Sequence, residues 1–473
     1  MTRLFGHYMA REAALLCLVE LLLSFALVYV MLGMVATPGM FGADSLPMLP
    51  LGPKIAGLGW RLAGVYLAAT LAATIVATAV TIGLYRPELS LQPRQLLRNA
   101  IVAGCLAFPA ALLVSETFRV GFSGRYMIWL IAVLVAWVLC VLCTRWLFAL
   151  ALRRHWFQRR VLILGTGPRA ERAAAGLSAK RCGLFEVAGM LDLAEAGLAP
   201  DGVSVLSSRS LAAQRIWAVM LAAEPGVELP LAPLLDCKLR GLRILDDARF
   251  WEEHLGRLNL DQTDAARLVA AEGFATGALM RGVQRAIDIA ISLTILMLTL
   301  PLMLITALAI RLDSKGPIFY RQCRVGLHGR HFTLFKFRSM AVDAEAEGSP
   351  RWAQRQDPRV TRVGGFIRAM RIDELPQVFN VLRGEMSVVG PRPERPHFVE
   401  QLARVIPLYD QRAYVKPGIT GWAQVNYPYG ASVEDAREKL SYDLYYVKNR
   451  GIFLDLVIMV ATVRVILFRE GAR

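Results

Sequence analysis

Histidine and cysteine are scarce in this sequence, with 6 and 7 residues among 473. The cysteines are scattered singly, except that Cys140 and Cys143 form a CxxC inside an apolar run, with no second pair to complete a zinc site. A Gly-x-Ser-x-Gly turn is missing as well. These absences argue against a disulfide-stapled scaffold, a soft-metal centre, and hydrolysis through a serine or thiol nucleophile.

Acidic residues are fewer than basic ones, 38 against 54, which gives a formal net charge of +16. Hydrophobic residues make up 55% of the chain, above the ~45–50% that is typical of soluble proteins. A membrane protein is therefore the first hypothesis, with its basic groups facing a membrane surface or phosphates. Nucleic acid is not expected as a partner, because no zinc-finger, helix-turn-helix or aromatic RNA-binding motif accompanies the charge.

Four apolar stretches have the length of transmembrane helices, at residues 13–34, 60–84, 97–118 and 126–150. The first lacks a small-residue cleavage site, so we interpret it as a retained span. Arginines gather before the first stretch, between the second and third, and after the fourth. The positive-inside rule therefore predicts that both ends of this four-helix domain, residues 1–152, face the cytoplasm.

The segment 153–280 opens like a Rossmann-like α/β domain. An apolar strand at residues 161–164 runs into the Gly165-Thr-Gly167 turn, and a second expected strand ends at Asp192, where a ribose contact would lie. Ala170 replaces the third glycine, and Pro168 removes one backbone donor. Nucleotide binding is therefore one hypothesis for this domain, and a structural or regulatory role is the favoured one.

The remaining segment, 281–473, begins with an apolar run that Pro301 interrupts. A fifth crossing would carry a basic domain outside, against the positive-inside rule, so we predict a re-entrant membrane helix at about residues 283–311, broken at Pro301. Arg285 and Asp288 would then lie at the headgroup level. The apolar run at 451–468 contains Asp455 and Arg464, and we interpret it as an interfacial or core helix.

An acidic pair, Asp373 and Glu374, precedes Pro376 at an expected helix start. Carboxylates at such a position often cap the helix, and this is the simplest alternative for Asp373. However, Arg371 lies directly upstream and the turn Pro391-Arg-Pro393 presents Arg392. A carboxylate that attacks a pyrophosphate needs such cations, and Mg²⁺ binds readily to one or two carboxylates.

Two further cations, Lys336 and Arg338, alternate with aromatic residues on one expected strand. Cations on one face suit a phosphate, although a solvated strand face would show the same pattern. A site that uses Lys336, Arg338, Arg371 and Arg392 to hold substrate phosphates is the hypothesis that unites these blocks.

Four ordered blocks resemble the bacterial sugar transferase family, the monotopic polyprenyl-phosphate phosphoglycosyl transferases. The blocks are Lys336-Phe-Arg-Ser-Met340, Asp373-Glu-Leu-Pro-Gln377, Gly390-Pro-Arg-Pro393 and Lys416-Pro-Gly-Ile-Thr-Gly-Trp-Ala-Gln-Val-Asn426. The likeness covers residues 281–473, and the preceding parts resemble the large members of the family. The segment 427–435 and the C-terminus are similar to a branch linked to exopolysaccharide and exosortase-associated loci. Leu300-Pro301 departs from the Ser-Pro pair that is often found at this position, which affects the expected geometry of the helix break.

The resemblance implies that Asp373 is the nucleophile of a covalent phosphosugar intermediate and that Glu374 is a Mg²⁺ ligand. It also implies that Asp443 is a further acidic residue of the site. Pro301 corresponds to the proline that breaks the re-entrant helix, and Lys336, Arg338 and Arg392 correspond to basic positions near the phosphates.

The fold class that we predict is a membrane α-helical bundle, a Rossmann-like α/β domain, and an α+β monotopic catalytic domain with a re-entrant helix. The expected reaction transfers a sugar 1-phosphate from a UDP-sugar to undecaprenyl phosphate, at the cytoplasmic face of the bacterial inner membrane, and begins exopolysaccharide or related glycan assembly. Two alternatives are a lipid-acceptor glycosyltransferase, although the sequence has no Asp-x-Asp motif, and a non-catalytic membrane scaffold or sensor. The identity of the sugar and the oligomeric state are left open, with a homodimer as the option considered.

Overall fold

The structure is a computed structural model, and it describes residues 2–4, 7–9, 11–35, 53–85, 89, 92–117, 124–154, 156, 158–179, 185–192, 211, 214–224, 226–260, 277–341, 359–427, 430 and 432–468. The chain forms two compact units. One unit contains Met9–Phe250, and the other contains Met1–Tyr8 together with Trp251–Arg473. The short strands β1 (Thr2–Leu4) and β2 (His7–Met9) pair with each other at the N-terminus.

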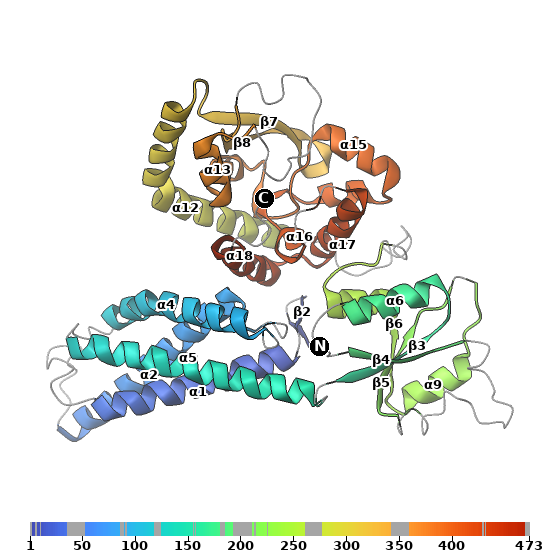
Figure 1. The fold of residues 1–473 in the computed structure, drawn as a ribbon, viewed down its shortest axis with the longest axis horizontal. Helices are drawn as coiled ribbons and strands as arrows, with labels where there is room; N and C mark the ends of the chain where they lie inside the picture. The colour runs from blue at the N-terminus through green and yellow to red at the C-terminus, as the bar shows by residue number, and fades with distance from the viewer. Residues whose placement is uncertain are drawn as a thin grey trace. The chain divides into compact units, whose positions relative to one another are not determined.

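The first unit begins with the four predicted apolar segments, and each is a helix (Figure 1): α1 (Arg11–Val35), α2 (Pro53–Ile82), α4 (Pro93–Thr117) and α5 (Gly124–Arg153). Each helix packs on the next, and α5 returns to contact α1. The buried positions of α2 and α4 include many alanines, such as Ala72 and Ala103, while larger residues such as Leu113 face outward. Small residues at the contacts and apolar residues outside are typical of helices that pack within a membrane.

A buried ion pair joins the first and last helices of this bundle. The Arg145 guanidinium lies 3.2 Å from the Glu20 carboxylate, and the two side chains are 0% and 2% exposed. Thr144 also donates a hydrogen bond to Glu20. Since a charge without a counterion is costly at such a position, the pair favours one alignment of α1 against α5.

The rest of this unit contains a four-stranded parallel sheet in the order β4-β3-β5-β6, and the two strands expected from the sequence are present. Its strands and helices are β3 (Arg159–Leu164), α6 (Pro168–Ala179), β4 (Phe185–Leu191), β5 (Ile216–Leu221), α9 (Leu231–Leu239), β6 (Arg243–Asp246) and α10 (Asp247–Phe250). An α/β domain is therefore observed, and its assignment as Rossmann-like stays a prediction.

The glycine turn after β3 has a structural explanation that does not require a nucleotide. Gly165 has a φ of +130°, and a Cβ there would lie 2.7 Å from the backbone oxygen of Ala222. The backbone N–H of Arg169, in the first turn of α6, donates to the Glu224 carboxylate at 3.0 Å. Helix N-termini attract anions, so Glu224 takes a place where a phosphate would bind in a nucleotide-binding turn.

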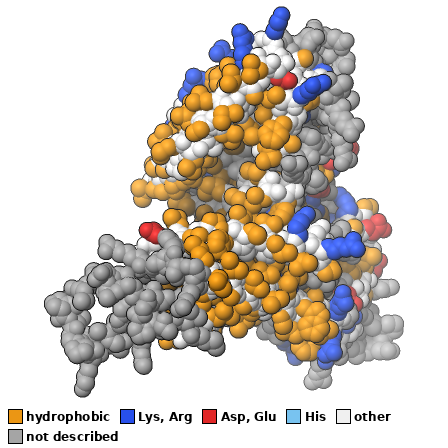
Figure 2. Space-filling model, turned by 60° about the vertical axis from the view of Figure 1, so that its left-hand side comes forward, with side chains coloured by type: hydrophobic (Ala, Val, Ile, Leu, Met, Phe, Trp, Pro, Cys, Tyr) orange, Lys and Arg blue, Asp and Glu red, His pale blue; other side chains and the backbone are white. Residues whose placement is uncertain are grey.

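The second unit is built on α12 (Ala278–Asp313), a continuous helix that contains Pro301. Figure 1 shows that α12 changes direction between its two halves, as expected for a proline that removes a backbone hydrogen bond. With α12, five described helices are long and apolar enough to cross a membrane, which indicates a membrane protein. Figure 2 shows how densely hydrophobic side chains cover the face in view. Re-entry of α12 through one leaflet stays a prediction.

The rest of this unit is a mixed α+β fold: η1 (Trp251–Leu255), β7 (Phe319–Val325), η2 (Leu327–Gly329), β8 (His331–Phe337), α13 (Arg362–Ala369), η3 (Ile372–Glu374), α14 (Gln377–Arg383), β9 (Ser387–Val389), α15 (Pro396–Val405), η4 (Tyr409–Tyr414), β10 (Gly418–Thr420), α16 (Trp422–Asn426), α17 (Val433–Asn449) and α18 (Ile452–Leu467). Strands β7 and β8 form an antiparallel hairpin, and β9 pairs with β10 in parallel. Helix α17 contributes Leu444 and Tyr445, both 0% exposed, to the core. Leu454 and Ile458 of α18 join the same core, so of the two options for residues 451–468, an interfacial or a core helix, this face of α18 supports the core.

The N-terminal half of α12 is fixed to this core by two polar side chains. Arg285 donates to the backbone oxygens of Val381 and Leu382, at 2.6 and 2.7 Å, and so caps the end of α14. Asp288 accepts hydrogen bonds from the hydroxyl of Ser387 and the backbone of Val388, both at 2.9 Å. These contacts are with α14 and β9, and the expected place of both side chains at the lipid headgroup level stays a prediction.

Candidate active site

The acidic pair lies on η3, a single 3₁₀ turn between α13 and α14. Arg371 precedes this turn with a φ of +57°, an uncommon conformation for a residue other than glycine. The reversal of the chain at Arg371 places Asp373 and Glu374 inside the fold, and each residue is only 8% exposed. Buried carboxylates need nearby compensation of their charge, and Lys336, Arg371 and Arg392 act on both of these, with direct ion pairs to Glu374.

Glu374 is surrounded by three cations that all approach its Oε1 atom. The nitrogens lie at 2.7 Å for Arg392 Nη2, 3.2 Å for Lys336 Nζ and 3.7 Å for Arg371 Nη1. Burial would raise the pKa of the Glu374 carboxyl, but Arg392 and Lys336 hold that pKa well below its usual range. Glu374 therefore carries its negative charge, as predicted for a residue at the centre of a basic cluster.

Asp373 has a different environment from that of its neighbour. Within the described part of the chain its carboxylate forms no hydrogen bond or close ion pair. It caps neither turn, since η3 and α14 have no side-chain cap, so the capping alternative is wrong. Burial raises the pKa of the Asp373 carboxyl, and the charge of Glu374 raises it further. A carboxylate with a raised pKa and no bound proton donor is more basic, and this favours nucleophilic attack.

Arg392 is presented by a backbone crossing that only glycine permits. The N–H of Gly390 donates to Thr420, and the N–H of Gly418 donates to Pro391, which ties the segment after β9 to the segment around β10. A Cβ on Gly390 would lie 2.3 Å from the Lys416 oxygen, and one on Gly418 would lie 2.1 Å from the nitrogen of Gly390. Close approach of the two backbone segments therefore explains why Gly390 and Gly418 are glycines. The same approach fixes the backbone that carries Arg392.

Asp443 does not contact the acidic pair, and it is linked to the site through Arg412. Its carboxylate pairs with Arg412 at 2.8 Å, and Arg412 donates to the backbone oxygen of Arg392 at 2.8 Å. Burial raises the pKa of Asp443 to about 6, even though Arg412 opposes this rise. No local sequence pattern points to Arg412 or to Tyr409, whose hydroxyl accepts a hydrogen bond from Arg412.

Arg338 is the one predicted phosphate ligand that the structure places elsewhere. It follows the last residue of β8, and its two terminal nitrogens donate to the backbone oxygens of Ser314 and Lys315 at 2.8 Å. These carbonyls follow the C-terminal end of α12, where a cation is favourable. The alternation expected on this strand continues to Lys336, which lies beside Glu374, but the strand ends at Phe337, so Arg338 does not share that position.

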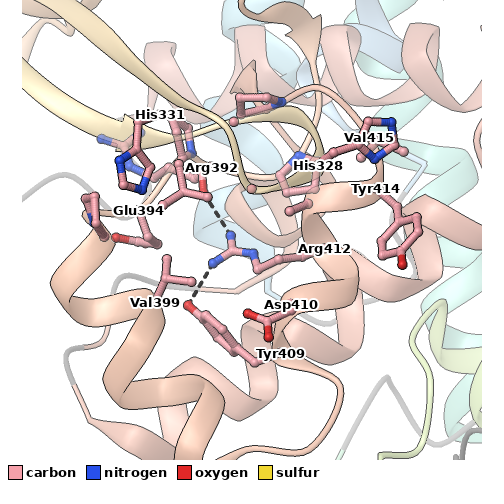
Figure 3. A pocket seen from close by; sticks show the side chains of 18 of the residues that line it. His328, His331, Arg392, Glu394, Val399, Tyr409, Asp410, Arg412, Tyr414 and Val415 are labelled. Carbon is pink, nitrogen blue, oxygen red and sulfur yellow. Dashed lines mark hydrogen bonds between the residues drawn. The ribbon is translucent and has the colours of Figure 1, made fainter.

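Two cavities adjoin the cluster. A cavity of about 430 Å³ contains Glu374, Arg371 and Asp443, and continues between apolar residues of α12 and α18. A second cavity of about 360 Å³, which Figure 3 shows, lies against Pro391–Glu394 and η4. Arg392 and Arg412 line both cavities. Two separate cavities therefore meet at the same pair of arginines, Arg392 and Arg412.

The oxygen atoms near Glu374 suit a hard divalent cation that takes most of its ligands from substrate phosphates and water. Among the described residues, no group of three or more His, Cys, Asp or Glu side chains is placed to hold a metal. The cations contact Oε1 of Glu374, so its Oε2 atom and the carboxylate of Asp373 are the available oxygens. Mg²⁺ fits such a set, because it prefers oxygen ligands and commonly binds one or two carboxylates together with substrate phosphates and water.

The described helices indicate a membrane protein, and an acidic pair inside a basic cluster is the kind of site that suits an anionic substrate. Residues 279–469 match the family model of the bacterial sugar transferases. An undecaprenyl-phosphate glucose-1-phosphate transferase of Caulobacter vibrioides that uses UDP-glucose is 41% identical over 191 residues, 40% of this chain and 71% of that protein. The chain belongs to the bacterial sugar transferase family.

Two longer alignments extend beyond this region. A UDP-N-acetylgalactosamine-undecaprenyl-phosphate N-acetylgalactosaminephosphotransferase of Aeromonas hydrophila is 43% identical over 240 residues, which are 51% of this chain and 56% of that protein. An undecaprenyl-phosphate glucose phosphotransferase of Komagataeibacter xylinus is 35% identical over 332 residues, which are 66% of this chain and 60% of that protein. The chain thus spans a little over half the length of these two relatives.

Proposed function

We propose that this protein transfers a sugar 1-phosphate from a UDP-sugar to undecaprenyl phosphate, at the cytoplasmic face of the bacterial inner membrane, and so begins the assembly of an exopolysaccharide or related glycan. The observation that carries this proposal is the contrast between two adjacent carboxylates: Glu374 is compensated by three cations, and Asp373 is buried without a partner among the described residues. The relatives from Aeromonas hydrophila and Komagataeibacter xylinus both act on undecaprenyl phosphate, and the first uses UDP-N-acetylgalactosamine, which supports these substrates.

The reaction proceeds in two displacements at one phosphorus. A carboxylate oxygen of Asp373 attacks the β-phosphorus of the UDP-sugar, the bond from this phosphorus to the bridging oxygen breaks, and UMP leaves. A phosphate oxygen of undecaprenyl phosphate then attacks the same phosphorus, and the bond to Asp373 breaks. The products are UMP and undecaprenyl diphosphate sugar, with Asp373 regenerated.

The basic cluster makes this attack possible, because a carboxylate and a diphosphate repel each other. Arg392 and Lys336, held beside Glu374, offset the negative charge of the donor and stabilise the phosphate of the leaving UMP. Glu374 would hold Mg²⁺, which supplies further charge neutralisation for the diphosphate when it is bound. The apolar walls of the larger cavity give the isoprenoid chain of the acceptor a place next to these charges.

The test uses the full-length protein in lipid nanodiscs with undecaprenyl phosphate and a panel of UDP-sugars. We expect UMP release with at least one sugar, and retention of radiolabel from the sugar on the protein when the lipid is omitted. Asp373→Asn should abolish both signals, and the matched variant Asp236→Asn, at an exposed residue of α9, should abolish neither. UDP as the product would support a lipid-acceptor glycosyltransferase instead, and no turnover with any sugar would support the non-catalytic scaffold.

A further inference from the structure

The two cavities beside the acidic pair share one wall and differ in the rest of their lining. Arg392, Glu394, Tyr409 and Arg412 line both of them. Since Arg392 also bonds to Glu374 at 2.7 Å, its side chain marks the point where both cavities reach the site. A molecule in either cavity can therefore place a phosphate at Arg392.

The larger cavity has an apolar end. Ile291 and Ile295 of α12 and Met459, Val463 and Ile466 of α18 line it. No titratable side chain from either helix is part of this lining. An isoprenoid chain fits these walls, and α12 is itself apolar enough to contact lipid.

The smaller cavity contains no residue of α12 or α18 in its lining. Figure 3 shows Glu394 and His331 on one side of Arg412, and His328, Tyr414 and Asp410 on the other side, with Asp410 next to Tyr409. His328 has a φ of +54°, and its ring lies edge-on to that of Tyr414, at 5.8 Å between centroids. Carboxylates line both cavities, but only the larger cavity has the apolar end that an isoprenoid chain needs, whereas the rings and carboxylates of the smaller cavity suit a flat base and ribose hydroxyls.

We propose that the smaller cavity binds the nucleoside of the donor, while the isoprenoid chain of the acceptor occupies the larger cavity. This inference rests on the proposed function and adds the division of the two substrates between two spaces. A volume of about 360 Å³ is within the usual range for a small-molecule site, roughly 300–1,000 Å³. The base packs against Tyr414 and His328, the ribose hydroxyls donate to carboxylates, and the α-phosphate reaches Arg392.

A double displacement requires that the phosphates of the donor and of the acceptor occupy the same position, which we place at Arg392. In each step the attacking and leaving oxygens lie roughly in line through the phosphorus. Asp373 attacks in the first step and leaves in the second, so the oxygen of undecaprenyl phosphate must enter from the place that the oxygen of UMP has vacated. The two phosphates share one position, and only the base and the isoprenoid chain can occupy separate cavities.

The test measures the two half-reactions and nucleotide binding separately. Tyr414 is 58% exposed, so Tyr414→Ala removes a ring without opening the core, and His328→Gly removes the second ring at a φ that glycine adopts freely. Each variant should lower kcat/KM for the UDP-sugar about tenfold, which is the scale of one lost stacking contact. Neither should change kcat/KM for undecaprenyl phosphate. The matched variant Ile466→Ser, at a 44% exposed residue of the larger cavity, should show the reverse pattern.

Calorimetric titration of the wild-type protein with UMP alone separates this inference from the proposed function. We expect UMP to bind, Tyr414→Ala to weaken its binding about tenfold, and undecaprenyl phosphate to compete with it. UMP that does not bind, or that binds equally well to Tyr414→Ala and His328→Gly, would overturn the inference, as would equal losses in both half-reactions. Binding of UMP in the smaller cavity without any lipid-linked product would refute the proposed function and keep the nucleoside site.

Discussion

The guanidinium of Arg412 donates a hydrogen bond to the backbone oxygen of Arg392 at 2.8 Å. The same Arg412 pairs with Asp443 of α17, and Arg392 pairs with Glu374. A chain of contacts therefore runs from the core helix α17 to the acidic pair. Because Arg412 is largely buried, its charge is tolerable only while Asp443 and the backbone oxygen of Arg392 accept its hydrogen bonds.

We predict that Asp443→Asn lowers the rate of sugar phosphate transfer through the position of Arg392. Loss of one partner of a buried ion pair leaves the other unpaired, so both half-reactions should slow, by about 10- to 100-fold, the scale seen when a supporting partner of a site is removed. Steady-state kinetics with both substrates varied measures this effect. Asp236→Asn is the control, and a loss confined to the donor half-reaction would argue against a shared role for Arg392.

The spans and the acidic pair could be predicted from the sequence because their physical cause is local. A membrane helix needs a long apolar run, and four such runs became α1, α2, α4 and α5. The pair at Asp373 and Glu374 was recognisable from neighbouring arginines in the sequence. Burial and the missing partner of Asp373 depend on β8 and on the turn at Arg392, which no local pattern contains.

Arg338 and Arg412 show the limit of such prediction. Both are arginines in polar segments, and only the folded chain separates their roles: Arg338 binds backbone oxygens beyond α12, and Arg412 joins α17 to the site. The partners that define these two roles are 20 or more residues away in sequence. The periodicity of a strand reports which face a side chain shares, but it does not report where the strand ends.

Gly418→Ala should destabilise the second unit strongly. The new Cβ would lie 2.1 Å from the nitrogen of Gly390, against backbone that cannot rotate away. We expect a loss in the free energy of unfolding of about 3 kcal/mol or more, typical of overpacking against backbone. Thermal unfolding in detergent measures it. Gly277→Ala, where a Cβ meets nothing within 4 Å, is the control and should change the midpoint little.

The buried carboxyl of Asp455 should make stability depend on pH in a defined direction. Burial raises its pKa to about 6, although Tyr446 and Gln284 donate hydrogen bonds to it. The folded chain then holds a proton that the unfolded chain, with a pKa near 3.9, releases more readily. Stability from this group is therefore greatest at low pH, and it falls as the pH rises from about 4 to about 6.

Comparison with Asp455→Asn isolates this effect from all other titrations. The difference in the free energy of unfolding, wild type minus variant, should become more favourable to the wild type as the pH falls from 7 to 4, by about 1–3 kcal/mol. Chemical unfolding at a series of pH values gives this difference. A difference that is constant over this range, or that changes in the opposite sense, would show that the folded-state pKa of Asp455 is not raised.

Glu374→Gln should separate the two roles that its carboxylate can have. In the structure Oε1 accepts from Lys336 and Arg392, and Oε2 is available to a metal. If Glu374 binds Mg²⁺, chelation of divalent cations stops transfer, added Mg²⁺ restores it, and the variant needs at least about tenfold more Mg²⁺ for half-maximal rate, as expected when a ligand is lost. A variant with a lower rate but an unchanged Mg²⁺ requirement would show that Glu374 serves only to hold the cations. We expect the first result, because three cations on one oxygen leave the second oxygen as the strongest hard ligand beside Asp373.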